Sequence, residues 1–229
     1  MSRHQFIIVI AAFFFFFVAA RADLVIQNQN VFFDETNLLT TRIHGDKIRD
    51  DSTGDKDWSI IKDAGTGDMF ILIPEKKEFL KYSGAKQKEW IKNRNKQSAA
   101  QPKLSDTGKS ENVGGYDAEI YSWSDNYGMS VTYWVAKEYP NYQRLKTYLA
   151  KYDEANFAGI GNNSPIEISK LPGMLVKAQS VTKDFTHTRT LISVKEEPVD
   201  ESIFEIPKDY REMDTTEGTQ PTNSSVIVK

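Results

Sequence analysis

The chain has 229 residues, 39% of them hydrophobic, and a formal net charge of -3, which suits one globular domain with a substantial core. It has no cysteine, and this excludes disulfides, thiolate metal sites, a thiol nucleophile and a lipid-modified cysteine anchor. Because the net charge is slightly negative, the protein attracts polyanions little at long range, and nucleic acid is not expected as a partner.

Residues 1–22 predict a cleaved export signal. Arg3 and His4 form a short positive start, and Phe6 to Val18 is an unbroken apolar run. Residues 20–22 (Ala-Arg-Ala) then have the small-x-small pattern that signal peptidases cleave. The apolar run is shorter than a transmembrane helix needs, so no integral membrane span is expected after cleavage. We therefore expect the mature protein to be exported, with the periplasm favoured over secretion.

After this segment the sequence reads as short strands separated by turn residues, which is typical of an antiparallel sheet. Leu38 to His44 and Lys47 to Asp51 form a predicted hairpin through Gly45, because glycine in the first position of a two-residue loop supplies the positive φ of a type II′ turn. Met69 to Ile73 is apolar on both faces, which predicts a strand covered on each side. Further strands are expected at Leu24–Asp34, Trp58–Lys62, Glu78–Tyr82, Lys103–Lys109, Tyr116–Trp123, Met129–Ala136, Met174–Lys183 and Thr186–Lys195.

Helical features are fewer. The lysine- and arginine-rich segment Gly84 to Gln101 predicts a short exposed helix or an excursion with a solvated basic face. Pro140 to Tyr152 is the best helix candidate, since proline suits a first turn and apolar residues recur at helical spacing. Asn156 to Pro165 is rich in glycine and asparagine and predicts a loop. We expect one α+β domain over residues 23–213, a curved antiparallel sheet with one or two helices on one side, and a flexible tail over residues 214–229.

Three stretches carry a resemblance to a known family: Gly45 to Arg49, Gly114 to Tyr121 followed by Val131 to Lys137, and Glu201 to Pro207 with Tyr210. In order and spacing they resemble an exported bacterial family known as a domain of unknown function (DUF4412-type). That family is similar to the LolA and LolB lipoprotein carriers and to outer-membrane lipoprotein-sorting proteins. The resemblance extends from about Leu24 to Met213 and consists of strand and turn signatures.

The resemblance implies a LolA-like fold, an incomplete and strongly curved antiparallel barrel whose open side is plugged by helices. In the carriers the concave inner face holds acyl chains, so a lipid or a lipidated protein is an implied partner. Family members often carry a cysteine where this chain has Ala118, and no lipoprotein-recognition residue of the carriers matches a position here. The implied fold therefore carries over, whereas lipoprotein transport does not follow from it.

No catalytic constellation is visible. His44 and His187 are the two histidines of the expected mature chain and are distant in sequence, and no Gly-x-Ser-x-Gly elbow accompanies them. Each is interpreted as a solvated or hydrogen-bonded structural histidine. We therefore expect no catalytic residue, no enzyme activity and no cofactor.

The acidic run between the second and fourth predicted strands invites a calcium interpretation. A calcium loop counted back from Gly54 would begin at Arg49 and end at Ile60, and neither can serve as a ligand there. A solvated hairpin edge that discourages strand addition is the better interpretation, and no metal site is expected. The run comprises Asp46, Asp50, Asp51, Asp55 and Asp57.

The strongest functional candidate is an apolar surface. Alternating positions on neighbouring strands, together with the expected helix, predict a concave cavity that suits a lipid or another hydrophobic ligand. The alternative is an ordinary filled core made by the same residues. The candidate cavity residues are Ile71, Ile73, Tyr121, Val131, Tyr133, Met174, Val176, Ile192 and Val194 on strands, with Leu145 and Leu149 on the helix.

Three functions are then compared. The favoured one is a periplasmic binding or carrier protein for a hydrophobic, lipid or acyl moiety. The second is a structural or protein-interaction module of the cell envelope with a filled core and an envelope protein as partner. A hydrolase is the third, and it is supported only by scattered polar residues.

Overall fold

The structure is a computed structural model that describes residues 23–54, 57–85, 104–125, 128–157 and 166–213. The predicted export signal (residues 1–22), nearly all of the basic segment and the predicted tail (residues 214–229) lie outside the described residues.

A single sheet of 12 strands forms most of the described structure. The strands are β1 (Asp23–Phe32), β2 (Glu35–His44), β3 (Lys47–Thr53), β4 (Trp58–Asp63), β5 (Met69–Ile73), β6 (Glu78–Tyr82), β7 (Ser105–Val113), β8 (Tyr116–Ser124), β9 (Ser130–Ala136), β10 (Met174–Val181), β11 (Thr186–Glu197) and β12 (Arg211–Glu212). Their spatial order is β12-β6-β5-β4-β3-β2-β1-β11-β10-β9-β8-β7. Every pairing is antiparallel except that of β12 with β6.

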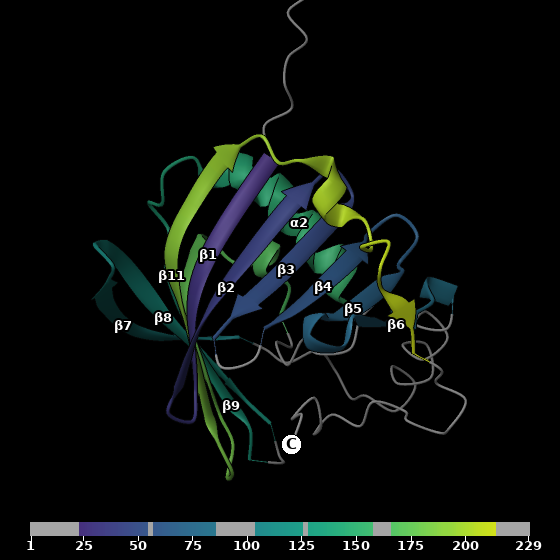
Figure 1. Ribbon diagram of the computed structural model, residues 1–229. Coiled ribbons are helices and arrows are strands. Elements are labelled where there is room, and N and C mark those ends of the chain that lie inside the picture. The colour runs from purple at the N-terminus through teal and green to yellow at the C-terminus, as the bar shows by residue number, and fades with distance from the viewer. Residues whose placement is uncertain (1–22, 55–56, 86–103, 126–127, 158–165, 214–229) are drawn as a thin grey trace, which may run out of the picture.

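The sheet consists of two meanders, β1 to β6 and β7 to β11, that join along β1 and β11. It is not closed, because β12 and β7 stand at its two ends without pairing to each other. The helix α2 (Tyr142–Phe157) connects β9 to β10 and lies across the concave face of the curved sheet (Figure 1). We call this the inner face. Three short 3-10 helices complete the described elements: η1 (Pro74–Lys76), η2 (Ile168–Lys170) and η3 (Glu201–Phe204).

Local sequence explains several of these elements. Gly45 has a φ of 58° between β2 and β3, as the predicted hairpin turn requires. In β5, Met69 and Leu72 are almost fully buried and point to opposite faces, which agrees with a strand covered on both sides.

The inner-face core forms where α2 meets the sheet. Leu145 and Leu149 of α2 are buried in one cluster with Leu24, Ile43 and Ile48 from the first three strands. Burying such aliphatic side chains is worth about 1.5–3 kcal/mol each, so this contact is the main force that holds α2 against the sheet.

Within the described residues, no helix combines the length and the hydropathy needed to cross a bilayer.

The helix is longer than its sequence indicates. The predicted helix ends at Tyr152, with Asn156 in a loop, whereas α2 continues to Phe157. Asn156 sits in the last turn, where its amide Nδ2 donates to the Tyr152 carbonyl at 2.7 Å and its Oδ1 accepts from Lys62 Nζ at 2.6 Å. Contacts with the sheet thus outweigh the low helix propensity of asparagine.

Three strand pairs have a shift in register, and two of these shifts lie near the inner-face core. The β1–β11 register shifts between Gln27 and Asn28, so that Gln27 pairs with Ser193, Asn28 pairs with Leu191, and Ile192 is passed over. A second shift, between Leu175 and Lys177, lies on β10. Beyond each bulge, the side chains therefore point to the face opposite to the one that strict alternation predicts.

Candidate functional site: a cavity between the sheet and α2

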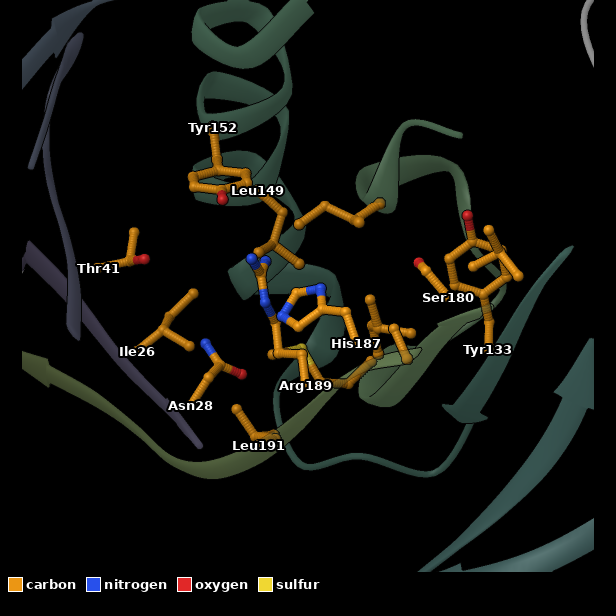
Figure 2. A pocket seen from close by; sticks show the side chains of 15 residues that line it. Ile26, Asn28, Thr41, Tyr133, Leu149, Tyr152, Ser180, His187, Arg189 and Leu191 are labelled. Atoms are coloured by element: carbon orange, nitrogen blue, oxygen red, sulfur yellow. The ribbon is translucent and has the colours of Figure 1, made fainter. Parts of the chain in front are cut away.

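A cavity of about 190 Å³ lies between the inner face of the sheet and α2. Figure 2 shows side chains from β1, β2, β9, β10, β11 and α2 converging on it. Its apolar lining comprises Ile26, Val131, Tyr133, Leu149, Ile168, Met174, Leu175, Ala178 and Leu191. Its polar lining comprises Asn28, Thr41, Tyr152, Ser180, His187 and Arg189.

Strand register explains why these side chains converge. Ser180 pairs with His187 and Ala178 pairs with Arg189 across β10 and β11. Residues that pair directly in an antiparallel ladder point to the same face, so both pairs face α2. Arg189 in turn pairs with Asn30 of β1, whose Oδ1 accepts a hydrogen bond from Arg189 Nε at 3.2 Å.

The structure brings some of the predicted cavity residues together. Val131, Tyr133, Met174 and Leu149 all line the cavity. The inward alternation of β9 and the apolar face of the helix are thus enough to locate two of its walls.

Other predicted cavity residues pack elsewhere. Leu145 and Val176 are buried in the inner-face core, and Val194 packs against that core. Tyr121 belongs to a second cluster with Val131 and Tyr133. None of these four lines the cavity.

Three further predicted residues lie away from the cavity. Ile71 and Ile73 are half-buried on β5, toward the β12 end of the sheet, and do not line it. Ile192 is 56% exposed, which corrects its predicted inward orientation. The cause is the bulge that passes over Ile192 in the β1–β11 register.

A buried ion pair lies beside the cavity. Lys62 Nζ is 2.7 Å from Asp50 Oδ2, and Thr41 Oγ1 donates to Asp50 Oδ1 at 2.6 Å. Burial is the largest single influence and lowers the pKa of Lys62, but the Asp50 carboxylate and Tyr152 together outweigh it, so the pKa is raised and the amine stays charged. Lys62 also lies over the ring of Tyr152, 5.5 Å from its centroid.

This pair corrects the interpretation of the acidic run at Asp50, whereas Asp46 and Asp57 are exposed and Asp55 lies outside the described residues. Asp50 is 4% exposed and faces α2, because it pairs with Thr41 across β2 and β3. Asp51, its neighbour, points to the outer face and binds Arg42 and Arg49 there. Alternation along a strand thus gives two adjacent aspartates different roles.

The two histidines have different environments. His44 is on the outer face, where its Nδ1 is 2.8 Å from Asp23 Oδ1, as expected of a hydrogen-bonded structural histidine. His187 instead lines the cavity, with its ring 6.0 Å from the Phe32 ring. Burial, and secondarily the charge of Arg189, lower the pKa of His187 to about 4, so the imidazole is neutral at pH 7.

Hydrogen bonds fix α2 in place over the cavity. Near its start, Tyr142 Oη donates to the Leu171 carbonyl at 2.9 Å. Asp153 accepts from the backbone N–H groups of Ile168 and Ser169 at 3.0 and 2.8 Å, which ties the helix to η2. With the Lys62–Asn156 contact, α2 is thus held along its length.

An aromatic cluster lies at the hairpin tips next to this site. The Phe32 ring is 4.6 Å from Phe33 and 5.2 Å from Phe185, which brings together the β1–β2 and β10–β11 turns. Phe33 is 58% exposed and has a φ of 52°, the left-handed region that few non-glycine residues adopt. We call these three residues the phenylalanine tip.

Sequence reasoning missed Arg189, Asn28 and Asn156, because each is a polar residue that follows no motif. The described residues contain no group of three or more histidine, cysteine or acidic side chains placed to hold a metal ion.

The fold and the cavity define a class of protein in which an open, curved antiparallel sheet carries a helix and a small internal cavity on its inner face. Residues 33–210 match the family described as "Domain of unknown function (DUF4412)", and the chain belongs to this family. The family resemblance inferred from the strand and turn signatures is thereby confirmed. No curated protein matches the chain in sequence.

Solved structures also resemble this one. An uncharacterized conserved protein from Thermus thermophilus is 6% identical, with a TM-score of 0.53 over 84% of this chain and 90% of that one. A putative outer membrane lipoprotein-sorting protein domain from Vibrio parahaemolyticus is 11% identical, with a TM-score of 0.35 over 80% and 89%. The LolA superfamily protein NE2245 from Nitrosomonas europaea is 10% identical, with a TM-score of 0.33 over 81% and 90%. Only the first TM-score exceeds 0.5, and at that identity it shows the fold alone.

Proposed function

We propose that this protein is an exported, non-enzymatic binding or carrier protein, working in the periplasm, that holds a hydrophobic lipid or acyl moiety between its curved sheet and α2. The observation that carries the proposal is the largely apolar cavity beneath Leu149. Concave apolar cavities with a few polar groups are the usual sites for such ligands.

The size of the cavity limits what it holds as it stands. Ligand pockets commonly measure about 300–1,000 Å³, whereas this cavity measures about 190 Å³. One short or partly inserted acyl chain suits that volume, and a lipid with two chains does not. A larger ligand would require α2, which lies across the inner face of the sheet, to move outward.

A titration with an uncharged hydrophobic probe tests this function. Delipidated protein is titrated with 1-octanol by calorimetry and with the fluorescent probe N-phenyl-1-naphthylamine. We expect saturable binding, which Ala178→Phe abolishes because the added ring fills the cavity. Ile192→Phe is the matched control, since Ile192 is exposed and lies outside the cavity, and it should bind as the natural chain does. No saturable binding at micromolar concentrations would refute the function.

A second candidate function is a protein-interaction module of the cell envelope, and the phenylalanine tip favours it. Phe33 is exposed within a cluster that joins two turns, an arrangement typical of contact surfaces, and strained backbone is often kept for function. Phe33→Asn removes the ring and suits the left-handed backbone. If this function holds, a stoichiometric partner copurified from gently extracted envelopes is lost with Phe33→Asn and kept with Ala178→Phe.

A further inference from the structure

Arg189 differs from the other arginines that the structure describes. Arg42, Arg49, Arg144 and Arg211 each form an ion pair with a carboxylate. Among the described residues, Arg189 alone of the five arginines has no carboxylate partner, and its one hydrogen bond runs from Nε to Asn30. The two terminal nitrogens of its guanidinium therefore remain available inside the cavity.

The position of this guanidinium is defined. Figure 2 shows the Arg189 side chain directed into the cavity, with the guanidinium toward Leu149 and Tyr152 of α2. The Nε hydrogen bond to Asn30 orients the planar group from behind. A guanidinium held at Nε presents its terminal N–H groups as a fork, the geometry that binds a carboxylate or a phosphate through two oxygens.

The Arg189 charge has no carboxylate partner among the described residues. No acidic residue lines the cavity, and the two buried carboxylates beside it are engaged elsewhere: Asp50 binds Lys62 and Thr41, and Asp153 accepts two backbone N–H groups of η2. His187 is uncharged at pH 7 and adds no charge of either sign. The guanidinium of Arg189 is thus the cationic group at this cavity that has no carboxylate within ion-pair distance among the described residues. Arginine cannot lose this charge by deprotonation, and a half-buried unpaired charge is costly, so an anion would relieve it.

We propose that the cavity binds a single-chain amphiphile with an anionic oxyanion headgroup, and that the Arg189 guanidinium holds the headgroup while the chain packs against Leu149 and its apolar neighbours. This inference rests on the proposed binding function and names its ligand class. The shared chemistry is an oxyanion on one alkyl chain, which a carboxylate or a phosphate monoester supplies.

Three probes of equal chain length separate the headgroup from the chain: octanoate, octyl phosphate and 1-octanol, each titrated into delipidated protein by calorimetry at neutral pH. We expect an anionic probe to bind at least about 10-fold more tightly than 1-octanol, because a hydrogen bond to a charged group is the stronger kind. Arg189→Gln should abolish that difference, so that the anionic probes bind no more tightly than 1-octanol. Arg42→Gln is the matched control, since Arg42 lies on the outer face, and it should preserve the difference.

Thermal stability gives a second readout. Without ligand, Arg189→Gln should raise Tm or leave it unchanged, because it removes an unpaired charge. The anionic probe should raise the Tm of the natural chain and not that of the variant. Whichever of octanoate and octyl phosphate binds more tightly identifies the headgroup as a carboxylate or a phosphate monoester.

The failures are distinguishable. Equal affinity for 1-octanol and both anions in the natural chain overturns the headgroup inference while the hydrophobic binding function stands. The headgroup inference is likewise overturned if the preference for anions survives in Arg189→Gln. If no probe binds, the proposed function fails and the headgroup inference fails with it.

Discussion

Lys62 Nζ on β4 lies 2.6 Å from Asn156 Oδ1 in the last turn of α2. This contact joins a strand of the first meander to a helix that leads into β10 of the second meander. It also places a charged group of the sheet at the end of α2 that flanks the cavity, next to Tyr152.

Asn156→Ala should therefore destabilise the protein. The change removes the hydrogen bond to a charged, buried amine, and such bonds contribute about 1.5–3 kcal/mol. Urea denaturation followed by circular dichroism measures the loss. Lys146→Ala, at an exposed position of the same helix, is the control and should change the free energy of unfolding by less than about 0.5 kcal/mol. Equal effects of the two variants would contradict the role given to Asn156.

Breaking the buried ion pair should cost more. Lys62→Met leaves the Asp50 carboxylate buried without its cation, for which a loss of about 3–5 kcal/mol is expected. The double variant Lys62→Met with Asp50→Leu should recover most of that loss, because no isolated charge remains. Lys77→Met breaks an exposed ion pair with Asp209 and is the control, because solvent screens such a pair and its loss should change stability far less than that of the buried pair. Additive losses in the double variant would show that the pair is not coupled.

His187 should make stability depend on pH. The unfolded chain binds a proton at this residue near the ordinary pKa of 6.5, whereas the folded protein does so near a pKa of about 4. The contribution to stability is therefore complete above pH 6.5 and is lost as the pH falls toward 4. We expect a loss of roughly 1–2 kcal/mol, since partial exposure of the ring reduces the full effect. The free energy of unfolding, measured by denaturation at several pH values between 4 and 7, should depend less steeply on pH in His187→Gln than in the natural chain. An equally steep dependence on pH in both would contradict the assignment.

Gly173 should not tolerate a side chain. A Cβ atom there would overlap the carbonyl group of Ala136 on β9, just before Met174 enters the cavity wall. Backbone cannot give way as a flexible side chain does, so Gly173→Ala should lower the free energy of unfolding by about 1–3 kcal/mol. The control is Gly114→Asn. Gly114 has open space around it and a φ of 60°, a conformation that asparagine tolerates. Similar melting temperatures for both variants would count against the steric explanation.

Much of the fold can be predicted from local patterns. Turn residues such as Gly45 and the alternation in β9 locate the strands, because hairpins and pleats depend on neighbouring residues. The site is harder to predict. A bulge in β11, which only pairing with the distant strand β1 determines, leaves Ile192 outside the cavity and places Leu191 in its lining. Asn156 extends α2 beyond its predicted end at the point where it binds Lys62 of a remote strand. Arg189 follows no motif, and its available guanidinium becomes visible only when the partners of every described arginine are known.

The pairing of β1 with β11 has a consequence for how the chain acquires its structure. The first strand of the domain cannot complete its ladder until nearly the whole polypeptide has been synthesised. Contacts so remote in sequence make folding slow, on the order of milliseconds to seconds, because the long intervening loop must close first. A nascent chain with this connectivity therefore stays unfolded for longer than a chain whose contacts are all local.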